Sequence, residues 1–254
     1  MSGIDKAAVN AEFSNKIRRL SKSSTYLEYC EEVYGYRIPL FNMMDQAQLD
    51  FVMQSIPLSK DDTVLDLGCG PMSILQLLTD KYGCHGIGID QLDEEAAGES
   101  GGNVSYIKGD IDAFSSYQLN PTVTLCIDSL YFSADAEALI RQLRAIVPNR
   151  LYLFYSQYLF GESSADKGML ACGNTAIGAI LNQNGIPFTA VDYSENEFHL
   201  YEASLRALQK HARAFEAEGN GDLLENKRRE DALGLELYEK GCASRYLYIV
   251  EAKS

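Results

Sequence analysis

Four aspartates stand at or just after the ends of short apolar runs that have the character of strands: Asp66, Asp90, Asp110 and Asp128. The first is followed by Gly68 and Gly70, in the stretch TVLDLGCGPM. Glycines two apart let the backbone turn sharply and approach a ligand, because no Cβ stands in the way. A carboxylate beside such a turn disfavours a phosphate group, but it attracts a cation and accepts hydrogen bonds from hydroxyls.

The glycine turn does not complete the fingerprint of a dinucleotide site. Counted from Gly68, the pattern GxGxxG requires a third glycine at position 73, where Ser73 stands. Asp90 closes the next predicted strand and suits the two hydroxyls of a ribose, because both of its oxygens accept hydrogen bonds. The residues therefore favour a cationic nucleoside ligand over NAD, although an NAD-dependent oxidoreductase would share the glycine turn.

Alternating strands and helices must position these side chains. Strands are predicted at 63–67, 85–90, 103–110, 122–128, 150–156, 186–194 and 244–252, and helices at 72–83, 134–147 and 174–185. This alternation is typical of an α/β protein with a parallel sheet and helices on both faces. Ligands of such sheets bind at the carboxyl ends of the strands, where the strand order reverses. The glycine turn lies at such an end.

Four segments are expected along the chain. Residues 1–60 form an N-terminal helical cap, 61–194 the ligand-binding core, 195–242 a helical insertion, and 243–254 the final strand. The insertion carries an apolar stripe with the spacing of a helix, made of Tyr201, Leu205, Leu208, Ala212 and Phe215. We expect the insertion and the cap to lie over the carboxyl edge as a lid. Packing on an outer face is the alternative.

Charge and composition narrow the function classes. The formal net charge is −14, so a nucleic acid would meet a repulsive field and is disfavoured as a partner. No apolar segment is long enough to span a bilayer, and the first residues lack the apolar region of a secretory signal. We therefore predict a cytoplasmic protein without a membrane partner. The six cysteines are scattered, which predicts neither a metal site nor a disulfide framework.

The motif set resembles that of class I S-adenosylmethionine-dependent methyltransferases. The first motif of that family, an acidic residue followed by GxGxG, corresponds to the run from Asp66 to Met72, with Met72 in place of the third glycine. The resemblance covers about residues 60–195 plus the last strand, and it implies a Rossmann-like sheet of seven strands, mostly parallel with the last antiparallel. The lid insertion before the final strand is similar to that of the small-molecule branch of the family.

The resemblance implies S-adenosyl-L-methionine as cofactor and assigns residues to it. Asp90 corresponds to the acid that binds both ribose hydroxyls, and Asp110, with Ile111 beside it, to the acid that reaches the adenine amino group. Asp128 begins the segment that faces the methionine part and the substrate. The expected cofactor contacts are Asp66, Gly68, Cys69, Gly70, Asp90, Gln91, Asp110, Ile111, Asp128 and Tyr26 of the cap.

Three residues are expected to face the substrate. Tyr131 and Tyr155 lie after or on predicted strands at the active-site edge, and His199 opens the insertion. Aromatic faces stabilise cations, so a tyrosine-rich acidic pocket favours an amine nitrogen of a small molecule as the methyl acceptor. O-methylation, which would need a base such as His199, is the first alternative.

Other uses of the same cofactor site stay open. Intramolecular displacement at the sulfonium would leave the motifs unchanged, and a non-catalytic protein that binds S-adenosylmethionine would carry them too. The sequence leaves the oligomeric state open between monomer and homodimer.

Overall fold

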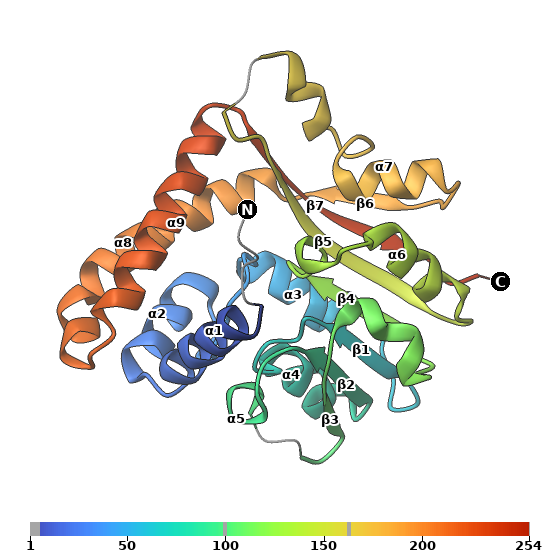
Figure 1. The fold of residues 1–254 in the computed structure, drawn as a ribbon, viewed down its shortest axis with the longest axis horizontal. Coiled ribbons are helices and arrows are strands. Elements are labelled where there is room, and N and C mark those ends of the chain that lie inside the picture. The colour runs from blue at the N-terminus through green and yellow to red at the C-terminus, as the bar shows by residue number, and fades with distance from the viewer. Residues whose placement is uncertain (1–5, 99–100, 162–163, 254) are drawn as a thin grey trace.

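Strands β1 to β7 form one sheet in the computed structural model, which describes residues 6–98, 101–161 and 164–253 (Figure 1). The strands are β1 (Thr63–Leu67), β2 (His85–Asp90), β3 (Val104–Lys108), β4 (Val123–Ile127), β5 (Arg150–Tyr158), β6 (Thr189–Asp192) and β7 (Ala243–Val250). Their order across the sheet is β3-β2-β1-β4-β5-β7-β6. β7 runs antiparallel to both of its neighbours, and the other pairs are parallel. The predicted mostly parallel sheet with an antiparallel last strand is confirmed.

The strand order reverses between β1 and β4. From β1 the chain proceeds outward through β2 to β3, and it then returns to place β4 on the other side of β1. The loops after β1 and β4 leave the sheet in opposite directions, which opens a crevice at the carboxyl ends of these two strands. The glycine turn and Asp128 stand at this crevice.

Helices surround the sheet and precede it. They are α1 (Lys6–Ser21), α2 (Ser24–Tyr34), α3 (Gln46–Gln54), α4 (Ser73–Tyr82), α5 (Glu94–Ala97), α6 (Ala136–Ala145), α7 (Ala176–Gln183), α8 (Ser194–Ala217) and α9 (Gly221–Glu239). Three 3₁₀ turns, η1 (Ile111–Tyr117), η2 (Leu130–Phe132) and η3 (Ser164–Leu170), join them. The three helices predicted between strands are α4, α6 and α7, whereas α5 and the 3₁₀ turns were not predicted. Within the described ranges, no helix is both long enough and apolar enough to cross a membrane.

Successive strand residues contribute alternately to two hydrophobic cores, one on each face of the sheet. Val64 and Leu125 pack with residues of α2, α3 and α4 on one face. Leu65 and Cys126 pack with α6 and α7 on the other. Because side chains of a strand point alternately to the two faces, the face of each residue follows from its position. Asp66 therefore shares the face of Val64.

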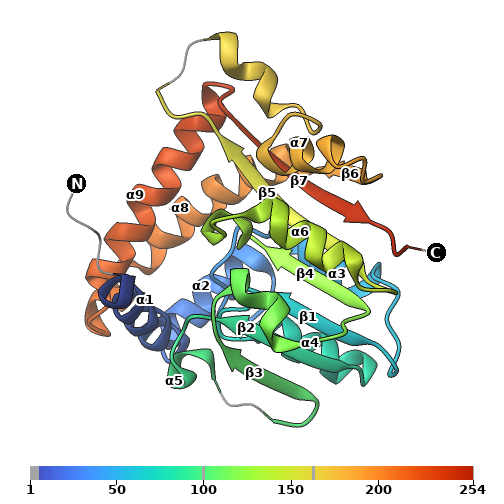
Figure 2. The ribbon, with the colours of Figure 1, turned by 45° about the vertical axis from the view of Figure 1, so that its right-hand side comes forward.

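The insertion between β6 and β7 is a pair of long helices that packs on the N-terminal helices. Figures 1 and 2 both show α8 and α9 beside α1 and α2, at one side of the sheet. Tyr29 of α2 links the two parts, since its ring meets that of Phe215 and its hydroxyl bonds to Ser204 at 2.5 Å. The predicted helical stripe is real. Leu208, Ala212 and Phe215 of the stripe pack in the core that includes α2, whereas the ring of Tyr201 lies against Tyr238 of α9.

One buried guanidinium connects the cap, the insertion and the sheet. Arg245 of β7 is fully buried and makes two hydrogen bonds to Asp128, Nη1 to Oδ1 at 2.7 Å and Nη2 to Oδ2 at 3.1 Å. Its Nε donates to Gln48 of α3 at 2.7 Å. Its Nη1 also lies 3.4 Å from Glu197 of α8. The final strand, the end of β4, α3 and α8 therefore meet at one cation.

We expect Arg245→Met to lower the free energy of unfolding by about 3–5 kcal/mol, because two carboxylates then stay buried without their counter-charge. Urea denaturation at neutral pH measures the change. The matched control is Arg37→Met, which removes half-exposed surface ion pairs to Glu28 and Glu31. Such pairs contribute roughly 0–1 kcal/mol, so an equal loss in both variants would contradict a special role for Arg245.

Candidate functional site

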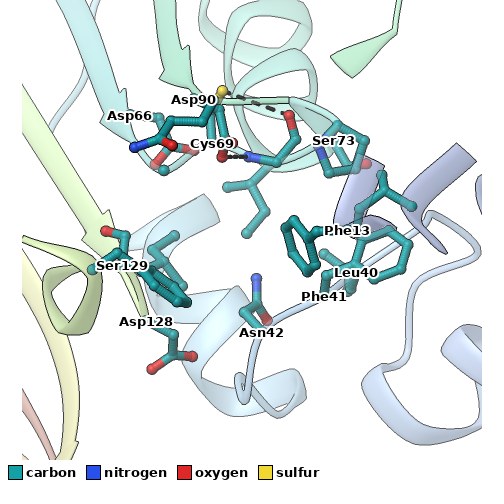
Figure 3. Close-up of a pocket in the computed structure, with 18 of the residues that line it drawn as sticks. Phe13, Leu40, Phe41, Asn42, Asp66, Cys69, Ser73, Asp90, Asp128 and Ser129 are labelled. Atoms are coloured by element: carbon teal, nitrogen blue, oxygen red, sulfur yellow. Dashed lines mark hydrogen bonds between the residues drawn. The ribbon is translucent and has the colours of Figure 1, made fainter. Parts of the chain in front are cut away.

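A cavity of about 300 Å³ lies at the crevice between β1 and β4 (Figure 3). Its walls come from the turn after β1, the ends of β2 and β4, helix α1 and the segment 39–42 that follows α2. Eight of the ten predicted cofactor contacts line it: Asp66, Gly68, Cys69, Gly70, Asp90, Gln91, Ile111 and Asp128. The structure thus brings together residues from the ends of four strands, β1 to β4, as parallel strands that end at one edge require.

The glycine turn is shaped by two left-handed residues. Gly68 has φ of 74°, and a Cβ on it would come within 2.4 Å of the Cβ of Ser129. Gly70 has φ of 54°, but a Cβ there would meet no atom within 4 Å. The first glycine is needed for close packing against β4. The second leaves a free approach to the backbone from the cavity.

Met72 and Ser73 occupy the two positions where the glycine patterns of nucleotide-binding turns place a third glycine. Met72 adopts a left-handed φ of 58° at the start of α4, the conformation for which glycine is favoured. The hydroxyl of Ser73 donates to the carbonyl of Pro39 at 2.8 Å. Ser73 thereby anchors the segment 39–42 over the turn, so this residue helps to close the cavity.

Asp66 is a buried carboxyl group with spare hydrogen-bonding capacity. Its side chain is 3% exposed, and its Oδ1 has no hydrogen-bond partner among the described residues. Burial, together with the charge of Asp90, raises the pKa of Asp66 to about 7. A buried acceptor without a partner costs free energy. A cationic or N–H-bearing ligand in the cavity would supply the missing donor.

Asp90 holds the turn and still faces the cavity. Its Oδ2 accepts from the backbone N–H of Gly70 at 2.9 Å, and its Oδ1 accepts from that of Leu92 at 3.1 Å. Burial raises the pKa of Asp90 above its usual value, and these N–H groups offset only part of that rise. A carboxylate has about four lone-pair sites, so each oxygen retains capacity for a ligand hydroxyl.

Asp128 reaches the cavity wall, but its charge is already compensated. Both of its oxygens bind Arg245, and Oδ2 also accepts from the N–H of Met43 at 2.8 Å. Figure 3 shows its carboxylate apart from Asp66 and Asp90. Asp128 therefore orders the wall rather than offering a free negative charge. The sequence showed the aspartate and gave no sign of its arginine partner, which is 117 positions away.

Two predicted cofactor contacts, Asp110 and Tyr26, are not among the residues that line the cavity. The side chain of Asp110 caps η1 by accepting from the N–H of Asp112 at 3.0 Å, while its neighbours Gly109 and Ile111 line the cavity. The hydroxyl of Tyr26 donates to the carbonyl of Leu40, and its ring stacks on Phe41 at 5.2 Å between centroids. Tyr26 thus supports a wall residue from behind.

The structure does not bring the three predicted catalytic residues to the cavity. Tyr155 packs in the core of α6 and α7, on the face of the sheet opposite Asp66. The ring of Tyr131 lies against that of Tyr155, tilted by 30° with centroids 4.7 Å apart, and its hydroxyl accepts from the N–H of Ser156 at 2.6 Å. His199 is 60% exposed on α8 and pairs with Glu202 at 3.0 Å. Tyr155 takes this face because β5 pairs with β4 so that its neighbour Phe154 lies on the face of Ile127, in the core that includes Val64. His199 lies on the exposed side of α8.

The cover of the cavity comes from residues that the sequence analysis did not single out. Phe13 of α1 and Phe41 lie across the cavity from Asp66, as Figure 3 shows, and Phe132 of η2 stands at the rim, 76% exposed. The spacing of Phe13, Ile17 and Leu20 has helical character. That signal indicates a buried helix face without showing what the face covers. Among the described residues, none of α8 or α9 lines this cavity. The N-terminal part of the chain therefore supplies its cover.

Titratable clusters of the metal-binding kind are not seen in the described part of the chain. No group of three or more His, Cys, Asp or Glu side chains there is arranged to hold a metal ion. The cavity walls within the same ranges contain carboxylates but neither lysine nor arginine. The electrostatics of the cavity therefore favour a cation.

Solved structures match this fold at low sequence identity. Phosphoethanolamine N-methyltransferase 2 from Haemonchus contortus, in complex with S-adenosyl-L-methionine, has a TM-score of 0.72 at 14% identity, over 95% of this chain and 60% of that one. The cyclopropane synthase MmaA2 from Mycobacterium tuberculosis has a TM-score of 0.67 at 15% identity, over 94% of this chain and 98% of that one. A SAM-dependent methyltransferase from Geobacter sulfurreducens, bound to S-adenosyl-L-homocysteine, has a TM-score of 0.56 at 15% identity, over 89% and 98%.

The matches establish the fold class. No protein-family model matches the chain, and no curated protein matches its sequence. The chain spans 60% of the length of the Haemonchus protein. Its fold is that of class I S-adenosylmethionine-dependent methyltransferases, which confirms the fold that the motif resemblance implied.

We expect Asp66→Asn to change how stability depends on pH. The pKa of Asp66 is raised by folding, so the folded state keeps the proton that the unfolded chain has already lost as pH rises from about 4 through about 7. Stability of the wild type therefore falls over this window. Relative to it, the Asn variant gains about 2–3 kcal/mol between pH 5 and pH 8, measured by urea unfolding without ligand.

The matched control is Asp61→Asn, at an exposed position in the turn that precedes β1. The stability of this variant should follow the wild type at both pH values. Parallel pH profiles of wild type and Asp66→Asn would contradict the burial of an ionisable group at Asp66.

Proposed function

We propose that this protein is an S-adenosylmethionine-dependent methyltransferase that methylates an amine nitrogen of a small molecule. The observation that carries the proposal is the buried Asp66 carboxyl, with an oxygen that lacks a partner among the described residues, beside an open glycine turn in a methyltransferase fold. A cation with N–H donors suits this carboxyl, whereas the pyrophosphate of a dinucleotide would be repelled by Asp66 and Asp90.

The residues present fit the cofactor. Gly70 leaves room for a ligand against the backbone, and Asp90 keeps lone pairs for two ribose hydroxyls. Gly109 and Ile111 offer a surface for the adenine, and Asp110 between them stays the proposed partner of its amino group. When bound, the cofactor supplies a methyl group that its sulfonium has already activated.

The task of the protein is then alignment and exclusion of water. Segment 39–42 closes the cavity through the bond between Ser73 and Pro39. Phe13 and Phe41 present aromatic surface on the side of the cavity away from Asp66, and Phe132 adds a third ring at the rim. Aromatic faces attract cations, so these rings suit the ammonium that forms when a neutral amine accepts the methyl group.

An amine acceptor fits this wall chemistry better than a hydroxyl. A hydroxyl must lose its proton to a general base as it is methylated. His199, the base proposed from the sequence, lies outside the cavity, and no other histidine lines the described walls. A neutral amine already has its lone pair and needs only water to take up its proton afterwards. Among the similar structures, the Haemonchus protein is by its name an N-methyltransferase, which supports an amine acceptor here.

We expect S-adenosyl-L-homocysteine to bind the protein in calorimetry and NADH not to bind. Asp90→Ala should weaken the affinity for S-adenosyl-L-homocysteine by roughly 1–3 kcal/mol, because the hydroxyl acceptors are lost and the turn at Gly70 is released. Asp61→Ala serves as the control, because it removes a carboxylate of the same size from the surface. Binding of NADH without S-adenosyl-L-homocysteine would overturn the proposed function.

Turnover is the second test. We expect release of S-adenosyl-L-homocysteine from S-adenosyl-L-methionine when a panel of primary and secondary amines is added, and a smaller or no response to matched alcohols. Mass spectrometry of the acceptors identifies the methylated atom. Methylated alcohols in place of amines would transfer the proposal to O-methylation, and cofactor binding without any product would indicate a non-catalytic binding protein.

A further inference from the structure

The cavity leaves little space for a second molecule beside the cofactor. Its volume of about 300 Å³ is at the lower end of ligand sites, which range over roughly 300–1,000 Å³. The proposed cofactor alone carries an adenine, a ribose and a methionine part. If the proposed function holds, the acceptor needs further room next to this cavity.

A second pocket of about 110 Å³ provides such room. It lies between the N-terminal helices α1 and α2 and the insertion helices α8 and α9. Four residues line both spaces and separate them: Phe13, Leu40, Phe41 and Asn42. Figure 3 shows these four on the side of the cavity away from Asp66 and Asp90. A molecule that passes this partition would have one end in each space.

Apolar side chains make most of the second pocket, among them Leu208, Phe215 and Leu224. Tyr26 and Tyr34, both buried, also line this pocket. This composition suits a short hydrocarbon body, because burial of apolar area is favourable at about 25 cal/mol per Å². The apolar lining does not by itself define which chemical group stands at the end of that hydrocarbon chain.

Charge distinguishes the two spaces. The charged residues among the described walls of the main cavity are all acidic, whereas the second pocket contains Lys16, Lys227 and Glu230. Lys16 and Glu230 face each other at 4.0 Å, and Glu230 is 63% exposed, so these two charges offset one another toward solvent. Lys227 is the more buried cation, with 18% of its side chain exposed.

Lys227 is fixed by a buried chain of polar groups. Its Nζ donates to Asp231 at 2.7 Å, Asp231 accepts from Ser204, and Ser204 bonds to Tyr29. Asp231 is 1% exposed and is not among the residues that line the pocket, whereas Lys227 is. A lysine has three donors, and within the described residues only Asp231 accepts from this one.

We propose that the second pocket binds the far end of the methyl acceptor, and that this end is an anionic group, a carboxylate or a phosphate, recognised by Lys227. The acceptor is then a short apolar chain with an amine at one end and an anion at the other. The acidic cavity takes the amine, the partition of Phe13 and Phe41 contacts the chain, and the lysine pocket takes the anion. Charge-assisted hydrogen bonds of this kind are stronger than neutral ones.

Matched probes test this recognition without knowledge of the natural acceptor. Calorimetry on the full chain saturated with S-adenosyl-L-homocysteine compares 6-aminohexanoate, 5-aminopentyl phosphate and 6-aminohexanamide. The amide has the shape of the carboxylate without its charge. We expect at least one anionic probe to bind about tenfold more tightly than the amide. Carboxylate and phosphate arms identify which anion is preferred.

Lys227→Met should reduce this preference to about twofold or less while it leaves the affinity for S-adenosyl-L-homocysteine unchanged, because methionine keeps the apolar stem. Lys210→Met is the control, since Lys210 also lies in the insertion but is 65% exposed and pairs with Glu32 outside the pocket. If Lys227→Met does not fold, the double variant Lys227→Met/Asp231→Asn removes both buried charges and tests the same point.

The outcomes separate this inference from the proposed function. Failure of S-adenosyl-L-homocysteine to bind would overturn both. Three outcomes would overturn only the recognition by Lys227, provided that S-adenosyl-L-homocysteine binds normally. These are equal affinities for the amide and the anions, an unchanged preference in the Lys227 variant, and no bound probe at millimolar concentration.

Discussion

The guanidinium of a fully buried arginine needs hydrogen-bond acceptors around it, and several elements of this protein are held together because they supply those acceptors to Arg245. Its partners come from the end of β4, from α3 and from α8, which are far apart in the sequence. Each of these elements must be in place before the guanidinium is satisfied, because removing water from a charge is costly unless hydrogen bonds replace it. The antiparallel β7 is the strand that brings the cation to this position. The network therefore links the formation of the sheet to the docking of the cap.

The same network determines what the strand-end aspartates can do. The charge of Asp128 is neutralised by Arg245. Asp128 also accepts a hydrogen bond from the N–H of Met43, which holds the segment that covers the cavity. Asp66 and Asp90 have no such cation among the described residues, and burial of Asp66, together with the charge of Asp90, makes ionisation of Asp66 unfavourable. A cationic ligand would relieve this repulsion. The division between one neutralised and two uncompensated carboxylates gives the cavity a preference for positive charge.

The cap and the insertion divide the space above the sheet. The N-terminal helix α1 and the segment 39–42 close the main cavity, while α8 and α9 close a second pocket behind that segment. Four residues thus serve two spaces of different chemistry. If the second pocket binds the far end of the acceptor, as we propose, the insertion helps to select the acceptor although it does not line the described walls of the main cavity.

The sequence by itself determined the alternation of strands and helices, the glycine turn and the edge at which Asp66, Asp90 and Ile111 meet. These depend on short-range periodicity and on the rule that parallel strands end at one edge. Only the tertiary structure decided that Arg245 neutralises Asp128, that Tyr155 faces the opposite core, that His199 points to solvent, and that Phe13 covers the site. The physical reason is that these outcomes depend on contacts between distant segments and on which face of an element is buried, and neither is encoded in local spacing.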